Sequence, residues 1–183
     1  MRADPAHPTG TAVTTMSLAN ANRHAELSRR LLEQANYELH TQGDRVQASD
    51  KASGAVAQAV KAIAEDRNWR HSSHNLRREI VDLLADEYDQ PELRHLQAIA
   101  DQLHENYYED RLTDPLLHQL VADVSRFIER LWEIREHGPN IDYSAAPSRE
   151  RIINRLLVPE EVARADESMD FPPPMPPFNP PAG

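Results

Sequence analysis

A stripe of small side chains that begins after Arg45 limits this 183-residue chain to few folds. Alanine recurs along the stripe at steps of three or four residues, which places the side chains on one face of an α-helix. Small side chains let a neighbouring helix approach at the short end of the usual spacing of about 8–10 Å. We therefore expect the helix from Arg45 to about Asp66 to lie at the centre of a bundle. The stripe consists of Ala48, Ala52, Ala55, Ala59 and Ile63, with Val56 and Val60 beside it.

Four further segments carry helical periodicity, and no segment alternates in the manner of a β-strand. Gly43 and Asp44 mark a turn between the first two helices, because glycine accepts positive φ beyond a helix end and aspartate caps the next helix. The sequence therefore predicts an all-α, up-and-down bundle of about five helices over residues 17–137. The first two helices are expected at about 17–41 and 45–66, and the third begins after a cap at Ser72 or Ser73. The fourth begins at Pro91, and the fifth runs from Asp114 until Gly138 and Pro139 end it.

The two ends of the chain differ in composition from the predicted bundle. Residues 1–16 lack the apolar region of a secretory signal and are expected to form a disordered leader. Residues 138–158 are expected to form a linker and, at 149–158, a short amphipathic helix whose apolar face needs cover from the bundle or from a partner. Residues 159–183 are acidic and then proline-rich, which predicts either a solvated tail or a ligand for an aromatic-lined groove. A protein partner for residues 149–183 is therefore one of the alternatives, beside docking of the short helix on the bundle and a solvated tail.

Charge and composition exclude several classes of function. A net charge of −10 is incompatible with a broad grip on DNA, which needs many cations to neutralise phosphates. The chain has no cysteine, so it has no disulfide, thiolate nucleophile or cysteine-based zinc site. No apolar run approaches the roughly 20 residues that span a bilayer. We expect a cytoplasmic protein without a membrane segment or a cofactor.

A dense group of ionisable side chains follows the alanine-striped helix. Four arginines surround the expected start of the third helix, whose free N–H groups also favour anions. A phosphate-binding site is therefore predicted there. Its residues are Arg67, Arg70, Arg77 and Arg78.

Two histidines in the same segment fit acid–base chemistry on RNA. His71 or His74, with an ordinary pKa of about 6.5, would move the 2′-OH proton. Arg67 or Arg70 would stabilise the charge that develops on the phosphate. The alternative is a structural corner, in which these side chains cap helix ends and form ion pairs. The expected partners in that case are Glu65, Asp66 and Glu79.

The fourth helix carries a second polar group. His104 and Tyr108 are four residues apart and share one helix face, which is expected to form a polar groove across a dimer. Alternatively, both make hydrogen bonds at a helix interface while Tyr107 packs in the core. His71 and His74 have no carboxylate at ligand spacing on a rigid element, so no metal site is expected.

Two motifs resemble a known family. The segment GDRVQASDKASGAVAQAVKAIAEDRNWRHSSHNL, from Gly43 to Leu76, and LHENYYED, from Leu103 to Asp110, are similar to the PaREP1 family of the HEPN superfamily. The resemblance covers roughly residues 17–135. It implies a HEPN-type helical bundle that is commonly a homodimer, from a superfamily found in toxin–antitoxin systems, phage defence and RNA processing.

Many HEPN proteins are metal-independent ribonucleases that carry an arginine and, after four to six residues, a histidine near the start of the last core helix. His104 stands at the place of that arginine, and no histidine follows at the required distance. The leading hypothesis is a binding or regulatory module for RNA or a partner protein, with an incomplete ribonuclease motif. The first alternative is an endoribonuclease of toxin or defence type, and the second is a scaffold that uses residues 149–183. The ribonuclease would use Arg67, His71 and His74, or His104 and Tyr108.

Overall fold

The structure is a computed structural model that describes residues 15–140 and Leu156. Five α-helices and one π-helical turn follow one another within the described residues, which confirms the all-α prediction. Residues 1–14, the rest of the predicted helix at 149–158 and the tail at 159–183 lie outside them. The elements are α1 (Thr15–Tyr37), η1 (Glu38–Gln42), α2 (Arg45–Asp66), α3 (His74–Glu87), α4 (Glu92–Glu109) and α5 (Asp114–His137).

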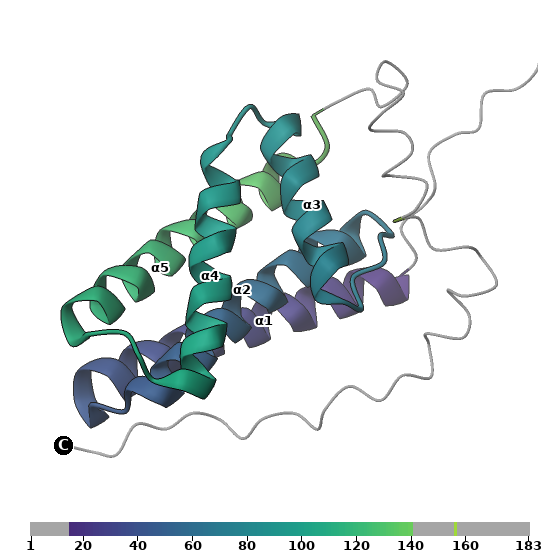
Figure 1. Ribbon diagram of the computed structural model, residues 1–183. Helices are drawn as coiled ribbons and strands as arrows, with labels where there is room; N and C mark the ends of the chain where they lie inside the picture. The colour runs from purple at the N-terminus through teal and green to yellow at the C-terminus, as the bar shows by residue number, and fades with distance from the viewer. Residues whose placement is uncertain (1–14, 141–155, 157–183) are drawn as a thin grey trace, which may run out of the picture.

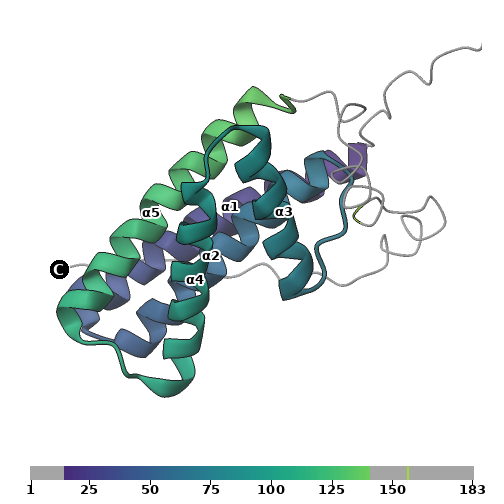
Figure 2. The same ribbon diagram turned by 45° about the horizontal axis from the view of Figure 1, so that its top comes forward.

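Helix α2 is the central element and packs against each of the other four helices. Figures 1 and 2 show α1 alongside it, while the shorter α3 and α4 cross it. The alanines of its stripe are fully buried, as their spacing predicts. Between α1 and α2, the buried Ser28 hydroxyl donates a hydrogen bond of 2.8 Å to the carbonyl of Ala55. This bond requires the close approach that small side chains allow.

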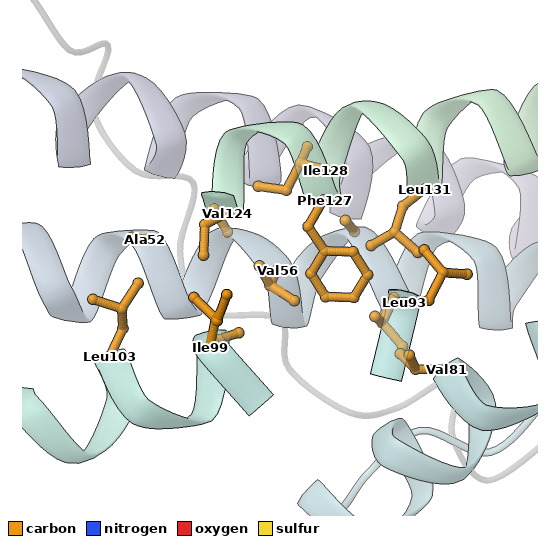
Figure 3. Packing of buried hydrophobic residues seen from close by; sticks show 14 of the residues in the cluster. Ala52, Val56, Val81, Leu93, Ile99, Leu103, Val124, Phe127, Ile128 and Leu131 are labelled. Atoms are coloured by element: carbon orange, nitrogen blue, oxygen red, sulfur yellow. The ribbon is translucent and has the colours of Figure 1, made fainter. Parts of the chain in front are cut away.

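The other helices supply the large side chains of the core. Phe127 of α5 is fully buried and points toward Val56 of α2 (Figure 3). Ile99 and Leu103 of α4 reach the same helix near Ala52 (Figure 3). Leu156 is also fully buried and belongs to this core. No helix within residues 15–140 combines the length and the apolar character of a membrane-spanning segment.

The predicted turn residues cap the helix ends. Gly43 has a φ of 69°, and Asp44 accepts a hydrogen bond of 2.9 Å from the backbone N–H of Gln47 at the start of α2. The cap of α3 is Ser73 rather than Ser72, because its hydroxyl accepts from the N–H of Leu76. The first helix differs from its expected form, since its last turn widens into the π-helical η1 before Gly43.

One buried polar side chain joins the end of α4 to α2. Asn106 is 3% exposed, and its amide donates a hydrogen bond of 2.9 Å to the Ser49 hydroxyl. Its amide oxygen accepts from the backbone N–H groups of Arg111 and Leu112, each at 2.9 Å. Asn106 therefore provides hydrogen-bond partners for the backbone of the turn between α4 and α5 and ties this turn to α2. Buried backbone groups without such partners are costly.

We predict that Asn106→Ala lowers the free energy of unfolding by about 2–3 kcal/mol, because it removes the partner of two N–H groups and one hydroxyl. Urea denaturation measures the loss. Gln102→Ala, at an exposed position of the same helix, should change stability by less than about 0.5 kcal/mol. Equal losses in the two variants would contradict the role assigned to Asn106.

Candidate functional site

The main candidate site is an open pocket of about 220 Å³ between α2, α3 and α4. His74, the first residue of α3, and His104 of α4 both line it, with ring centroids 5.1 Å apart. Arg77 lies one turn further along α3 and lines the same pocket. Residues that the sequence placed in two separate groups therefore meet in one site. The lining from α2 is Asp50, Ser53, Gly54, Val56, Ala57 and Val60, and α4 adds Gln97, Ala100 and Asp101.

His74 is exposed, and its pKa lies below the ordinary value for histidine. Its partial burial lowers its pKa below the ordinary 6.5, and the positive charges of Arg77 and of protonated His104 act in the same direction. Asp101 acts in the opposite direction but is a weaker influence. A neutral imidazole is an acceptor of protons, so His74 is suited to act as a base.

Arg77 supplies positive charge at the pocket, and Lys61 lies near Arg77 but outside the pocket lining. Burial lowers the pKa of both, and Arg77 is close enough to lower that of Lys61 further. Neither side chain forms an ion pair with a carboxylate of residues 15–140. Asp101 lies near Arg77, but its carboxylate already accepts from Arg78 at 2.8 Å and from Gln97 at 3.1 Å. The site thus holds one partly desolvated cation, Arg77, which favours an anionic ligand.

Tyr108 lies beside the pocket and faces solvent. Its ring meets that of His104 edge to face at 5.6 Å and that of Tyr107 at 4.8 Å. Tyr108 is 73% exposed, so its alternative place at a helix interface within the chain is wrong. Tyr107 is only partly buried and lies outside the core.

Arg67 is not in the pocket lining, although the sequence assigned it to the phosphate site. Its guanidinium forms a buried ion pair of 2.5 Å with Glu87, and the side chains are 6% and 1% exposed. It also donates to the Tyr88 hydroxyl at 3.2 Å and stacks over Trp69 at 4.9 Å. The second oxygen of Glu87 accepts from the N–H of Asn140 at 2.8 Å. Arg67 therefore ties the corner after α2 to the far end of α3.

The other predicted residues of the corner have separate partners. His71 pairs with Glu65 at 2.9 Å, as the structural alternative expected. Arg78 pairs with Asp101 at the pocket. Arg70 is exposed, and its backbone N–H donates a hydrogen bond of 2.5 Å to the carbonyl of Leu156. Of the four arginines, only Arg77 lines the pocket.

His24 is a buried histidine that no sequence motif singled out. It is 6% exposed and accompanies Ala21, Ala25 and Ser28 on the buried face of α1, so helical periodicity is the signal that locates it. Its Nδ1 is 2.6 Å from the Gln58 amide oxygen, and its ring meets that of His71 edge to face at 5.6 Å. Burial lowers the pKa of His24 from 6.5 to about 4.

We predict that Arg67→Met lowers the free energy of unfolding by about 3–5 kcal/mol, because Glu87 stays buried without its counter-ion. The double variant Arg67→Met/Glu87→Leu should recover part of this loss. Arg94→Met, which breaks exposed ion pairs with Asp82 and Asp86, should cost about 1 kcal/mol or less. Denaturant unfolding compares the three. A loss in Arg67→Met as small as that in Arg94→Met would refute the structural role.

His24 is expected to make stability depend on pH. The unfolded chain binds a proton near pH 6.5 but the folded chain only near pH 4, so stability is lost as pH falls through this window. Between pH 7 and pH 5, His24 lowers the free energy of unfolding by about 2 kcal/mol. The ionisable side chains around His24 are His71, Lys61 and Glu65. His24→Gln should flatten this dependence in urea unfolding, whereas the exposed-site variant His95→Gln should not. Equal slopes for wild type and His24→Gln would disprove the assignment.

Comparison with protein families places most of the bundle in a known family. Residues 23–128 match the model of the archaeal PaREP1/PaREP8 family. The matched segment extends from α1 into α5 and includes His24 and every residue of the pocket. No curated protein and no solved structure matches the chain.

Proposed function

The chain belongs to the archaeal PaREP1/PaREP8 family, and from this premise we propose that it is a HEPN-type helical protein that binds single-stranded RNA. The observation that carries the proposal is the meeting of His74, His104 and Arg77 in one open pocket. A phosphate of the RNA would lie in this pocket. Arg77, which lacks a carboxylate partner among residues 15–140, would face its charge.

The aromatic side chains beside the pocket favour RNA over a free anion. Tyr108 is largely exposed, and its ring adjoins His104. Exposed aromatic rings next to a cationic groove stack unpaired bases of single strands. The net charge of −10 leaves room for a short, local contact and not for a long duplex track.

A second candidate function is metal-independent cleavage of the bound RNA, and the pairing of two histidines favours it. His74 would take the 2′-OH proton, and the 2′ oxygen would attack the phosphorus. Protonated His104 would give its proton to the 5′ oxygen as the P–O5′ bond breaks, which leaves a 2′,3′-cyclic phosphate. Arg77 would stabilise the charge on the phosphorane, the role first assigned to Arg67 or Arg70.

The proposal includes a homodimer and a cytoplasmic location. The exposed Tyr108 on α4 supports a groove that continues across a dimer. A toxin or defence role follows from the HEPN resemblance and belongs to the cleavage candidate. A protein partner for residues 149–183 stays a prediction, because Leu156 is the only described residue of that segment.

The test is binding and cleavage of a mixed pool of single-stranded RNA in the presence of EDTA. Arg77→Gln should weaken binding by roughly 10- to 100-fold, since it removes a charge-assisted hydrogen bond to phosphate. It should also reduce the salt dependence of log K by about 0.7. Arg130→Gln, at an exposed position of α5, is the matched control and should bind as wild type does.

Cleavage is followed on the same samples. If the protein is a ribonuclease, His74→Ala and His104→Ala should each lower the rate by about 10²- to 10⁴-fold, while the exposed His95→Ala leaves it unchanged. Intact but bound RNA identifies a binding module. An absence of both binding and cleavage in folded wild-type protein overturns the proposed function.

A further inference from the structure

Three metal-ligating side chains meet where α1, the end of α2 and the α2–α3 corner converge. His24 comes from α1, Glu65 from the last turn of α2 and His71 from the corner. One donor atom from each lies within 4.8 Å of the other two. We propose that these residues bind a divalent transition metal of the zinc class, at a site separate from the RNA pocket.

The donor set suits zinc. Two imidazoles and one carboxylate are typical ligands, with metal–ligand distances of about 2.0–2.2 Å. A tetrahedral ion would hold neighbouring donors about 3.3 Å apart. His71 Nε2 and Glu65 Oε1 are already 2.9 Å apart. Both side chains remain about one-fifth exposed, so small rotations can close the remaining separation.

Neighbouring groups orient two of the donors. The Gln58 amide oxygen only accepts hydrogen bonds, so His24 Nδ1, at 2.6 Å, carries the proton. His24 Nε2 therefore keeps the lone pair that a metal needs, and the bond to Gln58 is the kind of outer contact that fixes metal-bound histidines. Ser17 donates to the backbone carbonyl of Glu65 at 2.5 Å and lies 3.4 Å from its carboxylate.

One buried polar atom of this corner is unsatisfied. His71 Nδ1 is buried and has no hydrogen-bond partner among the residues that the structure describes. Buried polar atoms nearly always have a partner, so a hydrogen-bonded cluster alone is an incomplete account of this corner.

A bound metal would link α1 and the end of α2 to the α2–α3 corner, which lies next to the RNA pocket. The carbonyl of His71 accepts a hydrogen bond of 3.3 Å from Arg77, which lines that pocket. Three protein ligands leave the fourth tetrahedral position open to water. Lys61 lies close enough to disfavour positive charge on His24, so it also opposes the metal.

The test is titration of chelator-treated full-length protein with Co²⁺ and Zn²⁺. Wild type should bind one equivalent of Co²⁺ with the intense visible absorption of tetrahedral coordination, and Zn²⁺ should displace it. His24→Gln and His71→Gln should abolish this spectrum. Gln58→Leu should weaken binding by about 10- to 100-fold, because it removes only the outer contact. Lys61→Met should tighten binding, which a purely structural role would not explain.

Two control variants locate the metal. His104→Gln alters the other histidine pair at the RNA pocket, and His95→Gln alters an exposed histidine, so both should keep the spectrum. Circular dichroism checks that each variant folds. If His24→Gln fails to fold, the spectra of Gln58→Leu and His71→Gln show whether the metal binds at this site. No Co²⁺ binding by wild type overturns the proposal. So does a spectrum that survives in His24→Gln and His71→Gln but is lost in His104→Gln.

Discussion

The close approach of four helices to α2 is the constraint on which the other features of the structure depend. The alanine face of α2 contributes little volume, so the core must be filled by large side chains from its neighbours, such as Phe127 and Leu103. The small size of the α2 side chains also explains the pocket. Ser53 and Ala57 of α2 line it opposite α3 and α4, and these small side chains leave a hollow that larger residues would close.

The charged groups around the polar corner after α2 have two roles, since one forms a buried ion pair and others line the pocket. Arg67 is buried against Glu87 and holds the corner to the end of α3. This anchoring lets His74 and Arg77 face the pocket from a fixed helix start. Because a buried ion pair is costly to break but contributes little net stability, the fixed position of the corner is its main consequence.

Features set by local sequence could be predicted, and features set by distant pairs could not. The helix pattern, the turn at Gly43 and the serine cap of α3 depend on residues a few positions apart, so periodicity and capping rules find them. The pairing of His74 with His104, and of Arg67 with Glu87, depends on how helices cross, which a single sequence does not encode in its spacing. Those crossings are also why, of the four predicted arginines, the pocket lining keeps Arg77 and leaves out Arg67.

The contact between Arg70 and Leu156 bears on the order in which the chain folds. Most helix contacts join elements that are adjacent in the sequence, and such local contacts form quickly. Leu156 lies beyond α5 in the sequence, yet its side chain is fully buried and its carbonyl accepts a hydrogen bond from the corner before α3. Closing so long a loop costs entropy that early contacts do not require. We therefore expect the helices of the bundle to pack first and Leu156 to complete the core last.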